Sequence, residues 1–127
     1  MRWAISGGAG FLGLHLARRL LADGHSVRTL DVQPLDEPEL ERSVDELRGD
    51  VRDPARAHEL VAGADVLVHT AAALPIRGSR DVITAVNVGG TATLFAAALE
   101  AGVGRTVFIS STAVYGIPKV HPIFDSP

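Results

Sequence analysis

The sequence contains no cysteine, which excludes disulfide bonds, thiolate metal sites and a cysteine nucleophile. Aromatic residues make up only 5% of the 127 residues while 46% are hydrophobic, so we expect an aliphatic core between helices and a parallel sheet. No basic excess is present, since the net charge is −3, and this argues against nucleic acid as a partner. The five histidines are scattered without ligand spacing, so no metal site is predicted.

Two further absences concern membranes. We expect no signal peptide, because the first apolar run begins directly after Met1 and Arg2. Charged residues are missing from residues 82 to 99, a stretch at the lower limit of length for a membrane span. That stretch contains Asn87, two glycines and three threonines, so we interpret it as a helix of a soluble protein, covered on both sides. The prediction is a cytoplasmic protein without a membrane partner.

A glycine-rich stretch lies between an apolar run, residues 3–5, and a segment with leucines at helical spacing, residues 14–23. A glycine turn between a strand and a helix is where the pyrophosphate of a dinucleotide binds. Gly7 suits the tight turn, Gly10 lets a phosphate approach the backbone, and Gly13 lets the helix pack closely. The alternative is a tight turn that binds no ligand.

A second strand-like run, residues 26–30, ends at Asp31. This acid follows Gly7 by about 24 residues, the spacing at which a carboxylate meets the ribose hydroxyls of a bound dinucleotide. A carboxylate there repels a 2′-phosphate, and the two residues that follow it include no arginine. The pattern therefore favours NAD over NADP.

The rest of the chain alternates between strands and helices. Asp53 and Pro54 are a favourable N-cap and first residue for a helix that ends near residue 61. Residues 32–41 are predicted to be a loop with at most one helical turn, and the chain from Ser111 onward is predicted to be a loop. The other elements are a weak strand at 44–48, a strand at 66–69, a long helix at 79–101 and a strand at 106–110. Parallel βαβ units follow, so the predicted fold class is α/β, a doubly wound, Rossmann-like parallel sheet with strand order 3-2-1-4-5.

Six motifs occur together in the order typical of one family. They are the glycine stretch 7–13, Asp31, Gly49-Asp50-Val51, His69-Thr70-Ala71-Ala72, Asn87-Val88-Gly89-Gly90-Thr91 and Ser110-Ser111-Thr112-Ala113-Val114-Tyr115-Gly116. With them the sequence resembles the N-terminal portion of extended short-chain dehydrogenases/reductases, of the NAD-dependent sugar epimerase/dehydratase kind. The resemblance spans nearly the whole chain. It implies NAD as the cofactor and a nucleotide sugar as the small-molecule substrate.

The resemblance also implies which residues bind the cofactor. The backbone at Phe11 and Leu12 would face the pyrophosphate, and Asp31 would hold the adenosine ribose. Asp50 and Val51 match the pair that borders adenine, with the carboxylate accepting from the exocyclic amine. For Asp50 the alternative is a solvated turn residue before a helix.

Small side chains in the fourth motif match a loop that passes under the cofactor. His69 receives no catalytic role, because a histidine at the end of such a strand is more often structural. Asn87 either contacts the cofactor near the nicotinamide or is a buried amide that ties backbone segments together. The full predicted cofactor-binding set is Gly7, Gly10, Phe11, Leu12, Gly13, Asp31, Asp50, Val51, Thr70, Ala71, Ala72, Asn87 and Ser110.

Ser111 is the predicted catalytic residue. By the resemblance, it matches a hydroxyl that hydrogen-bonds the reacting sugar oxygen and stabilises charge there during hydride transfer. Sugar 4,6-dehydratases carry an acidic pair directly after this hydroxyl, whereas here Thr112 and Ala113 cannot move the proton. A 4,6-dehydratase is therefore disfavoured.

Tyr115 and Lys119 have the spacing of the family's catalytic pair. That pair needs a helix so that residues four apart share a face, and Gly116 and Pro118 oppose one. We interpret this spacing as a coincidence and expect the family's tyrosine and lysine beyond residue 127, together with the substrate domain. Residues 1–127 are thus predicted to be a truncated NAD-binding domain, incomplete at the C-terminal edge of its sheet and inactive alone.

Three functions remain open. The first is an NAD-dependent epimerase that acts on a nucleotide sugar through transient hydride transfer. The second is an NAD-dependent oxidoreductase with net redox output, such as a hydroxysteroid-type dehydrogenase, and the third is a non-catalytic module that senses dinucleotides. Accumulation of NADH at turnover would separate the first two. The uncharged helix at 79–101 would either form a homodimer interface or be buried against a missing strand and helix.

Overall fold

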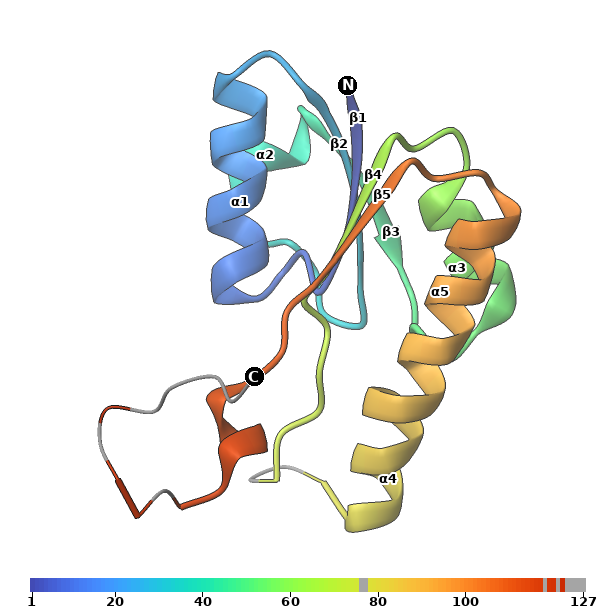
Figure 1. Ribbon diagram of the computed structural model, residues 1–127. Helices are drawn as coiled ribbons and strands as arrows, with labels where there is room; N and C mark the ends of the chain where they lie inside the picture. The colour runs from blue at the N-terminus through green and yellow to red at the C-terminus, as the bar shows by residue number, and fades with distance from the viewer. Residues whose placement is uncertain (76–77, 118, 121, 123–127) are drawn as a thin grey trace.

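The computed structural model, which describes residues 1–75, 78–117, 119, 120 and 122, contains a parallel sheet with helices on both faces (Figure 1). The strand order is β3-β2-β1-β4-β5, and each neighbouring pair is parallel, so the predicted fold class and strand order are confirmed. The strands are β1 (Arg2–Ser6), β2 (Ser26–Asp31), β3 (Val44–Arg48), β4 (Val66–His69) and β5 (Arg105–Phe108). The order reverses beside β1, so the carboxyl ends of β1, β2 and β4 meet at one edge where a ligand can bind.

The helical elements are α1 (Phe11–Ala22), α2 (Pro38–Glu41), α3 (Pro54–Val61), α4 (Arg80–Thr84), η1 (Ala85–Gly90), α5 (Thr91–Glu100) and the short 3₁₀ helix η2 (Thr112–Tyr115). α1 and α2 cover one face of the sheet, and α3 and α5 cover the other (Figure 1). Polar side chains cap the starts of α3 and α4: Asp53 accepts from the N–H of Ala55 at α3, and Ser79 accepts from the N–H of Val82 at α4. The predicted N-cap at Asp53 is confirmed.

Neighbouring residues of one strand supply two separate apolar cores, because successive strand residues point to opposite faces. Ile5 packs with residues of α1 and α2, including Ala17, Leu20 and Leu40. Its neighbour Ala4 belongs to the core on the other face, where α3 and α5 pack. The core residues of that second face are Ala4, Leu30, Val51, Ala57, Leu60, Val61, Ala64, Leu67, Leu94, Ala97 and Ala98.

The predicted long helix at 79–101 is present but not uniform. Its middle turn, η1, is a π-helix, and the physical reason is a run of poor helix formers, Val86 to Gly90. The prediction of a loop from Ser111 onward is also wrong in part. The side chain of Ser111 accepts from the N–H of Ala113, and this cap supports the single turn of η2.

The same helical stretch, Arg80–Glu100, is long and apolar enough to cross a membrane, by length and composition only, and helices from the core of soluble proteins share these properties. Only 22% of its most apolar window is buried, so the prediction that it is covered on both sides is wrong for the described part of the chain. The physical reason is that its inner side packs on α3 and the sheet, while residues such as Val88 and Leu99 stay exposed. β5 is exposed throughout and forms an edge of the sheet.

Candidate functional site

A cavity of about 420 Å³ opens at the carboxyl ends of β1, β2 and β4. It gathers most of the predicted site from separate parts of the chain: Gly7, Gly10, Phe11, Leu12, Gly13, Asp31, Asp50, Val51, Thr70, Ala71 and Ala72. The lining also includes residues outside the predicted cofactor-binding set: Leu30, Val32, Gly49, Ala73, Val86 and Ile109. Asn87, Ser110 and Ser111 do not line it.

The glycine turn leaves the start of α1 open toward this cavity. Gly7 has a φ of 76°, and a Cβ there would lie 2.5 Å from Thr70 Oγ1, so glycine is needed for both conformation and space. A Cβ at Gly13 would collide with the carbonyl oxygen of Gly7. α1 begins at Phe11 after Gly10, with no side chain capping its first N–H groups. Uncapped N–H groups and the positive end of a helix form a binding site for an anion such as pyrophosphate.

Asp31 lies at the end of β2 beside the glycine turn. Its Oδ2 accepts from the N–H of Ala9 at 3.0 Å, and its Oδ1 accepts from the N–H of Gln33 at 2.9 Å. The two bonds fix the carboxylate at the rim of the cavity, and each oxygen keeps a second lone pair for a donor such as a ribose hydroxyl.

Arg48 is a neighbour of Asp31 that the sequence reasoning missed. The two residues are paired in register across β2 and β3, and the Arg48 guanidinium donates to the carbonyl oxygen of Val32 at 2.9 Å. The predicted preference for NAD depended only on Asp31 and the two residues that follow it. The predicted parallel strand order was the signal that could have identified a cation from β3.

Asp50 lines the cavity next to β3, but its carboxylate is already engaged. Arg52 donates to it from Nε and Nη2, the shortest distance being 2.7 Å, and this hydrogen bonding lowers the pKa of the Asp50 carboxyl. Val51 is buried and packs against Gly90 of η1. The pair therefore lines the cavity, with Arg52 as an additional partner of the carboxylate, and its place beside adenine stays a prediction.

The floor of the cavity, defined here as residues 70–73, is attached to β1. The N–H of Thr70 donates to the carbonyl oxygen of Ser6 at 3.1 Å, and the Thr70 hydroxyl donates to the same oxygen at 2.7 Å. The N–H of Ala71 donates to Ser6 Oγ at 3.4 Å. Small side chains at these positions leave the space above the backbone free for a ligand.

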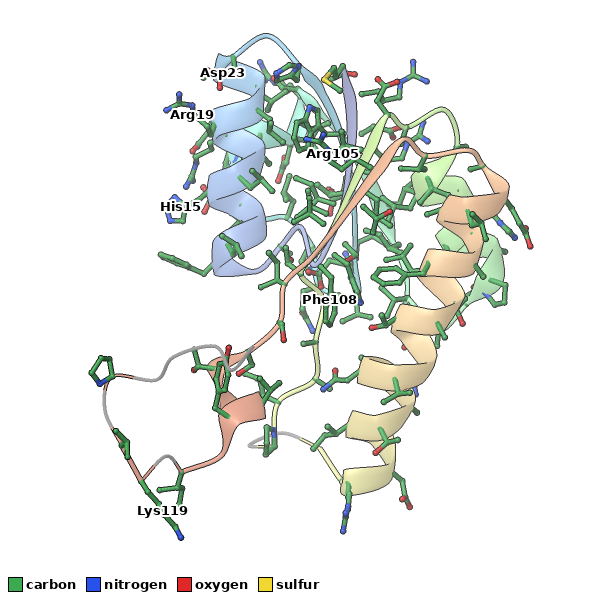
Figure 2. The ribbon with its side chains drawn as sticks, viewed as in Figure 1. His15, Arg19, Asp23, Arg105, Phe108 and Lys119 are labelled. Carbon is green, nitrogen blue, oxygen red and sulfur yellow. The ribbon has the colours of Figure 1, made fainter. Side chains whose placement is uncertain are left out.

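His69 lies beneath the floor and is buried, with an exposed fraction of 1%. Its Nδ1 is 2.5 Å from Ser6 Oγ and its Nε2 is 2.8 Å from Thr91 Oγ1. The rings of Phe95 and Phe108 lie against it, and Figure 2 places Phe108 at the end of β5. Burial lowers the pKa of the imidazole. The prediction of a structural histidine agrees with these contacts.

Asn87 of η1 bonds to the floor from the side. Its Oδ1 accepts from the N–H of Ala73 at 2.7 Å, and its Nδ2 donates to the carbonyl oxygen of Ala73 at 3.0 Å. Of the two interpretations left open, the geometry matches the amide that ties backbone segments together. Direct contact of Asn87 with a cofactor stays a prediction.

Ser110 and Ser111 follow β5, directly after the cavity residue Ile109, and both are exposed. Ser111 Oγ accepts from the N–H of Ala113 at 3.1 Å, and its own hydroxyl hydrogen can still be donated to a substrate oxygen. The catalytic role of Ser111 stays a prediction.

Tyr115 and Lys119 do not share a helix. η2 ends at Tyr115, and Gly116 follows with a φ of 66°. Figure 2 shows Lys119 on the C-terminal segment, pointing away from the sheet. The interpretation of their spacing as a coincidence agrees with this geometry, although Pro118 lies outside the described residues.

Several curated relatives resemble the chain over almost its whole length. A 3 beta-hydroxysteroid dehydrogenase/Delta 5-->4-isomerase of Mycobacterium tuberculosis is 39% identical over 120 residues, which cover 89% of this chain and 32% of the relative. A 2-alkyl-3-oxoalkanoate reductase of Stenotrophomonas maltophilia is 38% identical over 124 residues, covering 97% of this chain and 37% of the relative. The chain thus spans about a third of the length of such relatives.

Solved structures agree with the fold. A short-chain dehydrogenase/reductase superfamily protein from Agrobacterium tumefaciens with bound NAD superposes with a TM-score of 0.85 at 31% identity, covering 97% of this chain and 37% of that protein. UDP-glucose 4-epimerase from Bifidobacterium longum, in complex with NAD+ and UDP, gives 0.84 at 28% identity, with coverages of 97% and 41%. The prediction of NAD as the cofactor is confirmed by these neighbours.

The sequence also matches a family profile, that of the 3-beta hydroxysteroid dehydrogenase/isomerase family, over residues 4–125. This match contains the glycine turn, Asp31, the floor and Ser111, and it agrees with the predicted resemblance to extended short-chain dehydrogenases/reductases. The chain therefore belongs to the 3-beta hydroxysteroid dehydrogenase/isomerase family.

Proposed function

We propose that this chain is the NAD-binding portion of an NAD-dependent dehydrogenase that oxidises a hydroxyl group on a hydroxysteroid-type, alicyclic substrate. The observation that carries the proposal is the cavity in which the uncapped start of α1, Asp31 and the small-residue floor converge. The match to a hydroxysteroid dehydrogenase/isomerase family over residues 4–125 favours net oxidation. Relatives named as a dehydrogenase and a reductase support the same choice.

The described residues fit an extended dinucleotide. The first N–H groups of α1, at Phe11 and Leu12, would hold the pyrophosphate, because an anion satisfies these donors and the helix dipole together. Asp31 would accept from the ribose hydroxyls, and Asp50 with Val51 would border the adenine. When bound, NAD would accept the hydride that leaves the carbon bearing the substrate hydroxyl, and the hydroxyl proton would pass to a base such as the tyrosine that the resemblance implies.

Ser111 would act on the substrate side of the site. Its position two residues after Ile109, which lines the cavity, supports a place near the end of the cofactor where the substrate reacts. Its hydroxyl would donate to the substrate oxygen and stabilise the negative charge that develops there. The floor at residues 70–73 would keep the cofactor in register with that oxygen and exclude water from below.

A nucleotide-sugar epimerase is the second candidate. It is supported by a solved neighbour from Stenotrophomonas maltophila, a UDP-glucose-4-epimerase with bound NAD and formylated UDP-arabinopyranose, at 29% identity. In an epimerase the hydride returns to the substrate, so NADH does not accumulate.

A non-catalytic sensor of dinucleotides is the third candidate, and it would use the same cavity without Ser111.

The proposal for catalysis concerns a protein of the relatives' length, because the chain covers about a third of them. For the 127-residue chain alone we propose binding of NAD without turnover. The cytoplasmic location and a homodimer through the helix at residues 79–101 also remain proposals. The exposed outer side of that helix, with Val88 and Leu99, supports the homodimer.

The test follows NADH absorbance in a protein of the relatives' length that carries this chain. With NAD and a 3β-hydroxysteroid, the proposal expects NADH to accumulate in step with the ketosteroid product. A Ser111→Ala variant should lower kcat by roughly a hundredfold or more without weakening NAD binding. Interconversion of UDP-glucose and UDP-galactose without NADH accumulation, and no reaction with the steroid, would select the epimerase instead.

A further inference from the structure

A continuous chain of hydrogen bonds runs beneath the floor of the cavity. It passes from the N–H of Ala71 to Ser6 Oγ, on to His69 Nδ1, across the ring to His69 Nε2, and then to Thr91 Oγ1. From Thr91 it continues to the main-chain oxygen of Asn87, at 2.6 Å. Ser6 and His69 have exposed fractions of 0% and 1%, so water does not compete for their bonds.

The position of every proton in this chain follows from its last bond. A carbonyl oxygen can only accept a hydrogen bond, so the Thr91 hydroxyl donates its hydrogen to the carbonyl oxygen of Asn87. Thr91 Oγ1 must then accept from His69, which places the imidazole proton on Nε2. A neutral ring with a proton on Nε2 has a lone pair on Nδ1, so Nδ1 accepts from the Ser6 hydroxyl. Ser6 Oγ is in turn free to accept from Ala71.

Both ends of this series of hydrogen bonds reach the floor. At one end, Ser6 accepts from the N–H of Ala71. At the other end, Thr91 donates to the backbone oxygen of Asn87, and the side chain of Asn87 bonds to both the N–H and the carbonyl oxygen of Ala73. His69 is the only link between the two ends that these bonds provide. The floor segment between these anchor points lies where the resemblance expects a bound dinucleotide.

We propose that His69 is a positioning residue which, as the neutral tautomer with its proton on Nε2, holds the floor of the cavity in register through Ser6 and Thr91. The inference rests on the proposed function, in that the floor is taken to support bound NAD. His69 touches no substrate or cofactor and acts only through its two hydroxyl partners.

Protonation of His69 would reverse the direction of the hydrogen bond between His69 Nδ1 and Ser6 Oγ. Both ring nitrogens would become donors, so Nδ1 would donate to Ser6 Oγ, and the Ser6 hydrogen would lose its acceptor. The partners that face the ring are uncharged: Ser6 from β1, Thr91 and Phe95 from α5, and Phe108 from β5. None of these four can offset the added charge, so a protonated ring would loosen the floor, and NAD affinity would fall in acid.

The experiment compares two substitutions of one hydroxyl residue in the 127-residue chain. Thr91→Val keeps the shape of the side chain and removes the hydroxyl, whereas Thr91→Ser keeps the hydroxyl. Calorimetric titration with NAD at about pH 8 should show about tenfold weaker binding for Thr91→Val. Thr91→Ser should bind within about threefold of the wild type. Circular dichroism confirms that both variants are folded before the titration.

Nitrogen-15 NMR supplies a readout that does not need NAD. At about pH 8 the expected spectrum has a protonated Nε2 and an unprotonated Nδ1 for His69. The amide resonances of Ala71 and Ala73 should shift in Thr91→Val and not in Thr91→Ser, and in the wild type they should titrate together with His69.

The outcomes separate the two proposals. If the wild type does not bind NAD, the proposed function fails, and the Ala71 and Ala73 resonances still decide the role of His69. If NAD binds equally to all three proteins, or if the proton lies on Nδ1, the positioning role is refuted. Floor resonances that stay fixed in Thr91→Val would refute it as well.

Discussion

At the scale of single residues, Asp31 has the strongest influence on which dinucleotide can bind. Its carboxylate is fixed by the N–H groups of Ala9 and Gln33, at 3.0 and 2.9 Å, so it cannot turn away from an incoming ligand. Ribose hydroxyls can donate to such a carboxylate, whereas a 2′-phosphate would bring negative charge against it. Arg48 donates to the carbonyl oxygen of Val32, so a positive charge also lies close to the residue that follows Asp31.

Asp31→Asn should weaken binding of NAD by about tenfold or more, because the ribose hydroxyls lose a charged acceptor. In addition, the side-chain NH₂ group of the asparagine cannot accept the hydrogen bond that a carboxylate oxygen accepts from a backbone N–H. The preference for NAD over NADP should shrink, since the repulsion of the 2′-phosphate disappears. Calorimetric titration with each dinucleotide measures both effects. Glu41→Gln, the same loss of charge at an exposed position of α2, should leave both affinities unchanged. Equal losses in the two variants would contradict the assigned role of Asp31.

Residue types with one clear chemical use were predictable from the sequence. Gly7 and Asp31 lie at the expected turn and strand end, because their spacing along a βαβ unit fixes their positions in space. Ser6 and Thr91 were not predicted as partners of His69, since a hydroxyl in a sequence carries no sign of the group it will meet. Arg52 was missed for the same reason: its role depends on the turn that brings it onto Asp50.

At the scale of elements, the π-helix η1 sets the distance between the helical stretch and the side of the cavity lined by Asp50 and Val51. Gly90 packs against Val51, and a Cβ at Gly90 would lie 2.6 Å from Val51 Cγ2. Val51 is buried and β-branched, so it has little freedom to move aside. Gly89 precedes Gly90 in η1, and a Cβ at Gly89 would meet nothing within 4 Å.

These neighbouring glycines make a matched pair of variants. Gly90→Ala should lower the free energy of unfolding by about 1–3 kcal/mol through overpacking against Val51, and it should weaken NAD binding. Gly89→Ala should raise the free energy of unfolding by about 0.5–1 kcal/mol, because alanine is the better helix former and nothing obstructs its methyl group. Urea denaturation of both variants measures the difference. Equal stabilities for the two variants would show that η1 does not pack as described.

The order and type of the elements were predictable, since the apolar runs and the N-cap at Asp53 are local signals. The π-helix was not predictable from the same signals. It arises where a continuous helical pattern contains consecutive weak helix formers and where Gly90 fits closely onto a residue from another element. Such a tertiary contact has no signature in the helix's own sequence.

At the scale of the whole molecule, burial of His69 makes stability depend on pH. The folded state holds the imidazole neutral and lowers its pKa below the ordinary value, whereas the unfolded chain takes up a proton near that ordinary value. Between the two pKa values the unfolded state binds more protons, so the free energy of unfolding falls as the pH falls through this window. Above the ordinary pKa neither state is protonated, and the stabilising effect of the neutral ring is fully present.

A His69→Gln variant should lose this pH dependence while other groups titrate as before. Urea denaturation from about pH 8 to about pH 5 should show a steeper decline of unfolding free energy for the wild type than for His69→Gln. The slope is the measured quantity, so a constant loss of stability in the variant does not affect the comparison. Parallel slopes would contradict a depressed pKa for His69.

Occupation of the cavity at the start of α1 by NAD is the central claim. Isothermal titration calorimetry of the 127-residue chain with NAD and, separately, with NADP tests this claim with no assumption about the substrate. We expect saturable binding of one NAD per chain, with NADP binding roughly tenfold or more weaker because of Asp31. Absence of NAD binding, or tighter binding of NADP than of NAD, would contradict the claim.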